Sequence, residues 1–211
     1  MQTLQQRSPD LSVIIPVYNL EQYLEPMLES LKAQQLGSYL IEILFVLNNC
    51  TDNSEAVILE SGLDCQILSC ERQGCGPARN TGIEAALGEY SWMLDGDDWL
   101  LSKTAIKDAL DKCRAEHLDI LRIPFESDKF NRPYFSMVWQ YVIRRDFIDD
   151  IRFPYYQPSE DVAFMKTILR KAKCYDLNHL KLPSLEAPQY FYNYLREGSN
   201  MYRHHVLRER I

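Results

Sequence analysis

The chain has 211 residues, of which 46% are hydrophobic and 25% are charged. This composition excludes a disordered or fibrous protein and suits one compact α/β domain with a small appended region. The formal net charge of −7 argues against general nucleic-acid binding, because proteins that bind phosphate backbones usually carry the opposite sign.

Cysteine spacing and hydropathy bear on the location of the protein. None of the 6 cysteines forms a CxxC pair, and no histidine lies at a zinc-like spacing from them. Residues 1–10 are polar and lack the apolar core of a signal peptide. No run approaches the roughly 20 apolar residues that span a bilayer. We therefore expect reduced thiols, a cytoplasmic location and no transmembrane segment.

In chain order, short apolar runs alternate with amphipathic patterns over the first half of the sequence. Buried strands are predicted at residues 11–15, 41–47, 65–68, 90–94 and 118–123. Pro16 is expected to end the first strand, because proline cannot donate to a ladder. Helices are predicted at residues 21–35, 55–61, 77–88, 104–116 and 161–173. This alternation predicts a mostly parallel sheet with helices on both faces.

Three polar segments follow predicted strands directly. They are Pro16-Val17-Tyr18-Asn19, Asn48-Asn49-Cys50 and Asp95-Gly96-Asp97-Asp98. In open parallel sheets, ligands bind beyond the carboxyl ends of the strands. We therefore expect these segments, far apart in sequence, to meet at one edge of the sheet and to form a ligand site there.

The acidic segment Asp95-Gly96-Asp97-Asp98 carries three carboxylates within four residues. Their mutual repulsion would be relieved by a hard divalent cation with oxygen ligands, such as Mg²⁺ or Mn²⁺. Such a cation could bridge two phosphates of a ligand and neutralise charge on a leaving diphosphate. The alternative is a solvated acidic turn that caps the following helix.

The glycine-rich segment Gly74-Cys75-Gly76-Pro77-Ala78-Arg79-Asn80 opens a predicted helix. Free N–H groups at such a start can face an anion, and Arg79 adds a fixed positive charge. A dinucleotide fingerprint is excluded because Arg79 occupies the third glycine position, and a P-loop is excluded because no Gly-Lys-Ser/Thr follows. The alternative is an ordinary helix N-terminus.

Further polar and aromatic groups lie in the second half. Glu160 and Asp161 begin a predicted helix, where they would either cap it or supply a general base that takes a proton from a hydroxyl. Trp139 and the aromatic group Tyr190 to Tyr194 could stack on sugars, although such residues more often lie in cores. His204 and His205 belong to a basic tail that is either solvated or meets a diphosphate or a metal.

Taken together, these segments resemble the family 2 glycosyltransferases of the GT-A fold. The resemblance runs in order from about residue 11 to 199 and rests on seven segments. They are 12–19, 50–54, 76–82, 95–98, Trp139 with Arg144-Arg145-Asp146-Phe147, Glu160-Asp161, and Tyr192 with Arg196, Gly198 and Ser199. The family fold implies one α/β domain with a mostly parallel central sheet flanked by helices and a smaller acceptor-side region. Residues 1–123 would bind the nucleotide sugar. Residues 124–211 would supply the acceptor side, the base and the aromatic, basic tail.

The resemblance also implies roles for single residues. Asp161 is the expected catalytic base of an inverting displacement. Asp97, together with His204, is the expected ligand of Mn²⁺ or Mg²⁺. The residues expected to bind the nucleotide sugar and substrate are Pro16, Val17, Tyr18, Asn48, Arg79, Asp95, Trp139 and Glu160.

One segment departs from the family pattern. Family members commonly have Asp-Asp-Gly-Ser-Thr-Asp after the second strand, and the first Asp reads the nucleobase. Here Leu47 stands at that position, followed by Asn48 and Asn49, so a carboxylate acceptor is lost. An amide oxygen of Asn48 or Asn49 is the candidate substitute. This departure affects the assignment of the donor nucleotide, which the family resemblance implies is UDP, more than the assignment of transferase activity.

The sequence thus predicts a metal-dependent glycosyltransferase that moves a sugar from a nucleoside-diphosphate donor to an acceptor hydroxyl with inversion. The acceptor would be a glycan, a lipid-linked molecule or another hydroxyl compound; the basic tail leaves a modified nucleic acid open as acceptor, although the net charge disfavours it. The basic tail would suit peripheral contact with the inner membrane surface. The alternative function is a non-catalytic sugar-nucleotide-binding subunit. A nucleotidyltransferase is disfavoured, because no Arg- and Lys-bearing glycine loop follows the first strand.

Overall fold

The computed structural model describes residues 7–127, 137–155, 160–173 and 182–193 of the chain. The strands are β1 (Leu11–Val17), β2 (Ile41–Leu47), β3 (Gln66–Ser69), β4 (Tyr90–Met93), β5 (Trp99–Leu100), β6 (Ile120–Arg122), β7 (Phe125–Ser127), β8 (Tyr141–Arg144) and β9 (Tyr190–Tyr192). The helices are α1 (Leu24–Lys32), α2 (Ser54–Glu60), α3 (Cys75–Ala85), α4 (Ala105–Ala115), the 3₁₀ helix η1 (Val138–Gln140), α5 (Arg145–Ile148) and α6 (Glu160–Lys171).

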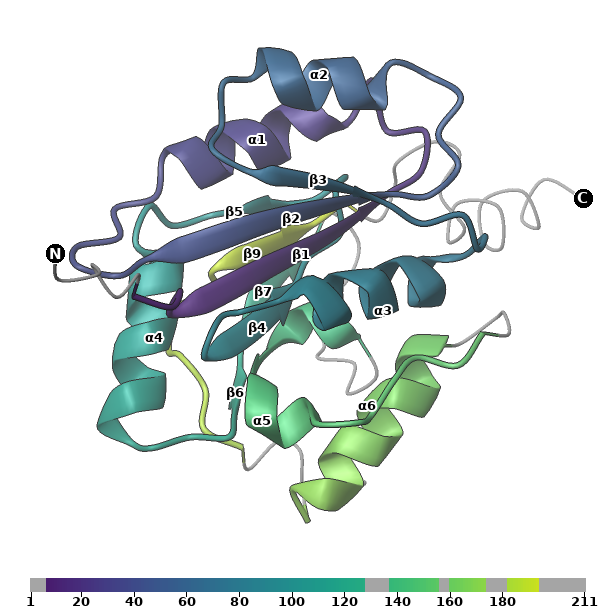
Figure 1. Cartoon of the computed structure of the whole chain (residues 1–211). Coiled ribbons are helices and arrows are strands. Elements are labelled where there is room, and N and C mark those ends of the chain that lie inside the picture. Colours follow the sequence, from purple (N-terminus) through teal and green to yellow (C-terminus); the bar gives the residue numbers. More distant parts are fainter. Residues whose placement is uncertain (1–6, 128–136, 156–159, 174–181, 194–211) are drawn as a thin grey trace, which may run out of the picture.

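Six strands form the central sheet in the order β3-β2-β1-β4-β8-β6 (Figure 1). The neighbours β3, β2, β1 and β4 run parallel, whereas β8 is antiparallel to both β4 and β6. A second sheet has the order β5-β9-β7. The predicted α/β architecture with a mostly parallel sheet is confirmed. The insertion of β8, from the less regular second half, between two strands of the first half was not predicted.

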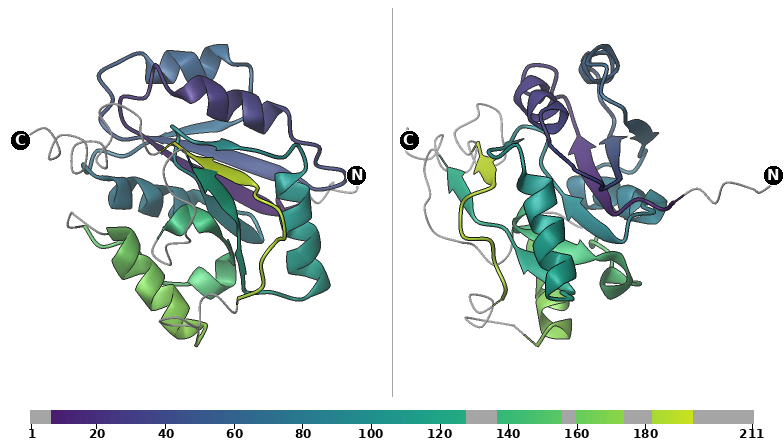
Figure 2. Two further views of the ribbon diagram at one scale, coloured as in Figure 1. Left: turned by 180° about the vertical axis from the view of Figure 1, so that it is seen from behind. Right: turned by 90° about the vertical axis from the view of Figure 1, so that its left-hand side faces the viewer.

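Alternation along the buried strands divides the core into two layers. Val13 and Ile15 of β1 face one layer, with α1, α2, α4 and the small sheet, while Ile14 faces the other, with α3, α5 and α6. Figures 1 and 2 show these helices on opposite sides of the central sheet, with the small sheet in view from behind. Helices therefore cover both faces, as the sequence predicts.

Pro16 does not end the first strand, contrary to the prediction. β1 continues to Val17, and Pro16 pairs in register with Val46 of β2. On the opposite side, β4 pairs with β1 only as far as Ile14, whose carbonyl accepts the Leu94 N–H at 3.0 Å. Since alternate residues point the same way, the missing N–H of Pro16 faces the side on which β4 has already stopped pairing. The ladder thus loses no hydrogen bond.

Two helices differ in extent from the prediction. α3 begins at Cys75, two residues before the expected start at Pro77, because the first turn of a helix needs no N–H partners and tolerates proline. α1 begins at Leu24 rather than near Glu21, and it buries Leu24, Met27, Leu28 and Leu31. No helix in the described parts of the chain is long and apolar enough to cross a membrane.

Candidate active site at the carboxyl edge of the sheet

Hydrogen bonds join the segments that follow β1, β2 and β3. Asn19 accepts the Thr51 N–H at 2.8 Å, and Glu21 accepts the Asn53 N–H at 3.1 Å. These bonds connect the ends of β1 and β2. The segments after β1 and β2 therefore meet at one edge of the sheet, as predicted, and β4 runs parallel to β1 beside them.

Asn48 organises the start of the glycine-rich segment. Its amide nitrogen donates to the carbonyl oxygens of Cys70 (2.9 Å) and Arg72 (2.7 Å), and its amide oxygen accepts the Gly74 N–H at 2.8 Å. The side chain is buried, and both N–H bonds of the amide are used inside the protein. Asn48 thus fixes the loop that leads into α3. The proposed reading of a nucleobase by its amide is incompatible with this arrangement.

Arg79 lies at the centre of the site. It lies in α3, its side chain is 3% exposed, and it donates to Asp95 Oδ1 at 2.7 Å through Nη2. Through Nη1 it donates to Asp161 Oδ1 at 2.5 Å and to Glu160 Oε1 at 3.4 Å. One guanidinium therefore connects the acidic turn after β4 with the first residues of α6, which the sequence places 65 residues apart (160 minus 95).

The close packing of α3 against the segment before α6 makes this bridge feasible. A Cβ on Gly76 would lie 3.0 Å from the Pro154 carbonyl oxygen and 3.1 Å from Phe153 Cβ, so a larger residue would push these neighbours apart by a few tenths of an ångström. Asn80, one residue beyond Arg79, exchanges two hydrogen bonds with the Phe153 backbone at 2.8 and 2.9 Å. The sequence motif around Arg79 therefore serves largely to join these two elements.

Asp161 has an unusual protonation equilibrium. Burial raises its pKa, Arg79 opposes that effect, and the nearby Glu160 and Asp95 add to it, so the pKa rises to about 7. Its side chain is 19% exposed, which leaves it reachable from solvent. A carboxylate with a pKa near neutrality can accept a proton from a hydroxyl at physiological pH.

The three aspartates of the acidic turn differ sharply in environment. The side chain of Asp95 is 26% exposed, Asp97 is half-buried, and Asp98 is 0% exposed. Burial, with further repulsion from Asp97 and Asp95, raises the pKa of Asp98 well above its usual range. Buried away from solvent, the Asp98 carboxylate accepts hydrogen bonds from the Tyr190 hydroxyl and from the Asn193 N–H, the latter at 2.8 Å. Sequence reasoning missed both partners.

The remaining predicted site residues fall into three groups. Tyr18 is 54% exposed at the end of β1, next to the buried Pro16 and Val17, so its ring is available to a ligand. Trp139 is 1% exposed and stacks on Tyr190 and Tyr192 with centroids 4.8 and 5.0 Å away. A sugar cannot reach this ring, so the core alternative applies. His204 lies outside the described residues.

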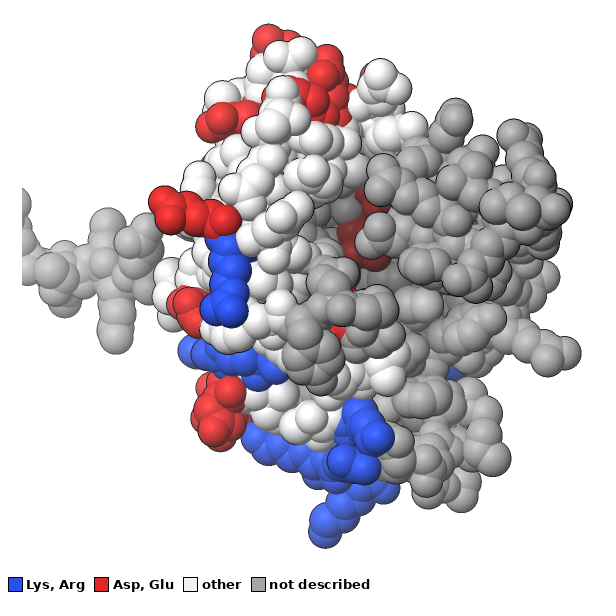
Figure 3. All heavy atoms as spheres, turned by 90° about the vertical axis from the view of Figure 1, so that its right-hand side faces the viewer, with Lys and Arg blue, Asp and Glu red and all other residues white. Residues whose placement is uncertain are grey.

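Asp95 and Asp97 offer hard oxygen ligands, which suit Mg²⁺ or Mn²⁺. In the described part of the chain, no three His, Cys, Asp or Glu side chains are grouped to hold a metal ion. This agrees with the usual mode of Mg²⁺ binding, in which one or two carboxylates act together with substrate phosphates. Figure 3 views the molecule from the side where these strands end and shows acidic side chains set deep between other residues.

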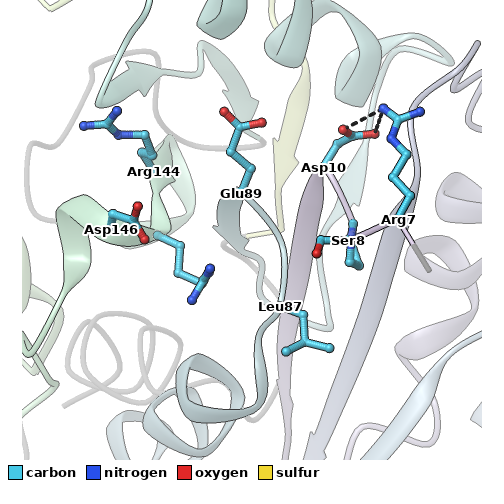
Figure 4. Close-up of a pocket in the computed structure, with 9 residues that line it drawn as sticks. Arg7, Ser8, Asp10, Leu87, Glu89, Arg144 and Asp146 are labelled. Atoms are coloured by element: carbon cyan, nitrogen blue, oxygen red, sulfur yellow. Dashed lines mark hydrogen bonds and ion pairs between the residues drawn. The ribbon is translucent and has the colours of Figure 1, made fainter. Parts of the chain in front are cut away.

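A pocket of about 390 Å³ lies at the opposite edge of the sheet (Figure 4). It is lined by Arg7, Ser8, Pro9, Asp10, Leu87, Glu89, Arg144, Arg145 and Asp146. None of the predicted site residues belongs to it. The pocket flanks the amino ends of β1 and β4, whereas ligands of open α/β sheets bind at the carboxyl ends.

Comparison with known proteins finds glycosyltransferases that are similar to this chain. The chain is 38% identical over 96 residues to the putative glycosyltransferase EpsH of Bacillus subtilis, and the aligned segment covers 44% of this chain and 27% of EpsH. It is 27% identical over 218 residues to the poly(ribitol-phosphate) beta-N-acetylglucosaminyltransferase TarS of Staphylococcus aureus, covering 90% of this chain and 36% of TarS. The chain thus spans about a quarter to a third of the length of these two relatives.

Solved structures show the same fold. The S. aureus TarS complex with UDP-GlcNAc superposes with a TM-score of 0.78 at 24% identity, over 91% of this chain and 60% of that one. A mannosyltransferase from Pyrobaculum calidifontis, in complex with GDP-Man and Mn²⁺, gives a TM-score of 0.69 at 16% identity, over 94% and 61%. The predicted GT-A fold is confirmed. The family model for glycosyl transferase family 2 matches residues 12–175, and the chain therefore belongs to this family.

Proposed function

We propose that this glycosyltransferase moves a sugar from a UDP-linked donor to an acceptor hydroxyl with inversion at the anomeric carbon. The observation that carries the proposal is the buried Arg79, which contacts both the acidic turn at Asp95 and the carboxylate of Asp161. A donor-binding group and a proton acceptor are thereby held in one rigid unit. The distance between them is fixed by a single side chain rather than by two independent loops.

Asp161 is the proposed general base. The acceptor oxygen attacks the anomeric carbon while its proton passes to Asp161. The bond between that carbon and the donor diphosphate breaks, and the diphosphate leaves with the bonding electrons. A pKa of about 7 suits this task, since it leaves a substantial ionised fraction at neutral pH. One base opposite one leaving group favours a single displacement, and hence inversion.

Asp97 and Asp95 would hold Mn²⁺ or Mg²⁺ against the diphosphate. The cation, when bound, would supply positive charge to the leaving group. Support comes from the oxygen character of these ligands and from two neighbours of like fold, whose complexes contain Mn²⁺ with GDP-Man and Mg²⁺ with UDP. Arg79 cannot replace this charge, because its guanidinium is shared among three carboxylates.

The uridine assignment is supported by the TarS complexes with UDP and UDP-GlcNAc. In this chain Leu47 is nearly buried at the end of β2, and the Asn48 amide is bonded to the loop before Gly74. We propose that the exposed Tyr18 ring provides most of the nucleobase contact, with Asn49 as the polar neighbour. Asn49 is exposed, and its amide nitrogen donates to the Glu71 carbonyl oxygen at 3.1 Å, which leaves its amide oxygen as the candidate acceptor for the base.

The proposed acceptor is a hydroxyl compound of the glycan or lipid-linked class. The name of TarS refers to the polymer poly(ribitol-phosphate), and that of the minor teichoic acid biosynthesis protein GgaB of B. subtilis refers to teichoic acid. Such a polymer is therefore a first candidate for assay. Residues 124–211 remain the predicted acceptor side of the domain.

A donor screen tests the proposal. Several nucleotide sugars are incubated with Mn²⁺, and released nucleoside diphosphate is measured with and without polymer and glycan acceptors. Release from UDP-linked donors, lost on chelation, is the expected result. Calorimetric donor binding without release or transfer to any acceptor would instead identify a non-catalytic binding subunit. Equal release from GDP- and UDP-linked donors would overturn the uridine assignment alone.

A further inference from the structure

Strand β9 and the residue after it, which come much later in the sequence, form hydrogen bonds with the acidic turn at residues 95–98. The Tyr190 hydroxyl of β9 donates to the buried carboxylate of Asp98. The oxygen of this hydroxyl also accepts the Asp95 N–H at 3.2 Å. Asn193 follows with two more contacts. Its N–H donates to Asp98 at 2.8 Å, and its amide nitrogen donates to the Asp97 carbonyl oxygen at 3.2 Å. Each aspartate of the turn therefore has a bond to this one segment.

Tyr190 is itself held rigidly. It is 0% exposed, stacks on Trp139 at 4.8 Å between ring centroids, and pairs with Leu100 of β5 and Phe125 of β7. Its hydroxyl is thus fixed by a packed aromatic core and two neighbouring strands. A polar atom held in this way can determine the position of the groups bonded to it.

The opposite side of the turn is equally confined. A Cβ on Gly96 would lie 2.8 Å from Leu20 Cδ1 and 3.3 Å from Ile15 Cγ2. The turn is therefore held between the core under Gly96 and the hydroxyl of Tyr190. Among the three aspartates, only Asp95 and Asp97 keep exposure to the cleft.

We propose that Tyr190, Asn193 and Asp98 are positioning residues that aim the Asp95 and Asp97 carboxylates at the cation and diphosphate. This inference rests on the proposed function. Three carboxylates so close together repel one another, and a turn without internal donors would spread them. The donors from Tyr190 and Asn193 bind the third carboxylate inside the protein, so the other two keep one orientation.

The test compares Tyr190→Phe with a matched variant, Tyr90→Phe. Tyr90 is also buried, and its hydroxyl donates to the Leu118 carbonyl oxygen at 3.2 Å, but it begins β4 at the opposite edge of the sheet. Both changes remove one hydroxyl from a buried tyrosine. Mn²⁺ binding in the presence of UDP is measured by calorimetry, and stability by urea unfolding.

We expect Tyr190→Phe to weaken Mn²⁺ binding by about 10- to 100-fold, the usual effect of losing a group that orients metal ligands. Tyr90→Phe should lose comparable stability and keep the wild-type affinity. Asn193→Ala should weaken Mn²⁺ binding several-fold and serves if Tyr190→Phe does not fold. Asp98→Asn, which keeps one of the two acceptor oxygens used by Tyr190 and Asn193, should retain more affinity than Asp98→Ala.

The possible failures are distinguishable. Equal Mn²⁺ affinity in the wild type, Tyr190→Phe and Asn193→Ala would overturn the positioning role while leaving the proposed function intact. A parallel loss in Tyr90→Phe would show a general effect of stability and would also overturn it. A wild-type chain without Mn²⁺-dependent UDP binding would overturn the proposed function and the positioning role together.

Discussion

The two edges of the central sheet both contain carboxylates bonded to arginine, and they differ in charge balance. At the carboxyl edge, Arg79 alone faces Asp95, Glu160 and Asp161, and its side chain is 3% exposed. At the amino edge, Arg7 and Arg114 face Asp10 and Glu89.

Within these ion pairs, one formal positive charge against three negative ones leaves an excess of two negative charges at the carboxyl edge (3 minus 1), whereas two positive charges face two negative ones at the amino edge. An excess of buried negative charge is costly unless a ligand compensates it. The imbalance therefore supports the site proposed at the carboxyl edge, and the ion pairs at the amino edge serve as the structural comparison. Four predictions test this contrast.

The largest expected effect concerns catalysis. Asp161→Asn should lower kcat by up to about 10⁴-fold, the range for loss of a general base, while the donor Kd stays within about twofold, because the amide keeps the shape of the side chain. The matched change at the amino edge, Asp10→Asn, should leave kcat unchanged. Steady-state kinetics and donor calorimetry measure both, and full turnover by Asp161→Asn would refute its role as base.

The second prediction concerns stability. Arg79→Met leaves three carboxylates without their buried partner and should cost about 3–5 kcal/mol of the free energy of unfolding. Arg114 is 37% exposed, and Arg114→Met should cost about 1 kcal/mol or less. Urea unfolding at pH 7.5 gives both values. Equal losses would mean that the difference in burial has no energetic consequence.

The third prediction concerns the donor. Asp97→Asn, or chelation of the metal, should weaken donor binding by about 10- to 150-fold, which corresponds to the loss of one contact between charged groups. Asp146→Asn, in the pocket at the amino edge, should leave donor binding unchanged. If Asp97→Asn bound the donor with wild-type affinity in Mn²⁺, the metal assignment would be wrong.

The fourth prediction concerns pH. Asp161, with a pKa raised to about 7 by burial, must lose its proton to act as a base, so kcat should fall about tenfold per unit as pH drops below 7. For Asp10, burial acts to raise the pKa, but the Leu40 N–H and Arg114 outweigh it and lower the pKa. Carboxyl NMR titration should show the two groups shifted in opposite directions.

These shifts also have opposite consequences for stability. A lowered pKa means that the stability contributed by Asp10 is present above its unfolded pKa and is lost as pH falls through the folded value. A raised pKa means that Asp161 favours the folded state while protonated and loses that contribution as pH rises toward about 7. Of these two carboxylates, Asp161 is the one whose ionisation near neutral pH opposes folding, and the proposed function requires that ionisation.

Local sequence patterns predicted the central strands and their common edge. Continuous apolar runs ending in polar residues suffice for that, because a parallel sheet brings strand ends together. Patterns also pointed to Arg79, Asp95 and Asp161, although their mutual contact depends on the close approach at Gly76, which no local pattern encodes.

Other features depend on contacts between distant residues, which local patterns do not report. The bond between Tyr190 and Asp98 spans 92 residues, and the sequence favoured a core role for the aromatic cluster at 190–194 without indicating any partner for the Tyr190 hydroxyl. Asn48 occupies a position where an amide could face a ligand or the protein, and only the course of the loop from Cys70 to Gly74 decides between them. Pro16 ends a strand only if both neighbouring strands continue beside it, and β4 does not.

The late arrival of β9 has a consequence for synthesis. Asp98 leaves the ribosome well before Tyr190, and at about 5–20 residues per second the interval is on the order of 5–20 s. During that time the strands β1 to β4 can pair, while the acidic turn still lacks the hydroxyl that binds it. The turn that we propose to hold the metal therefore gains its Tyr190 contacts only after these parallel strands have been synthesised.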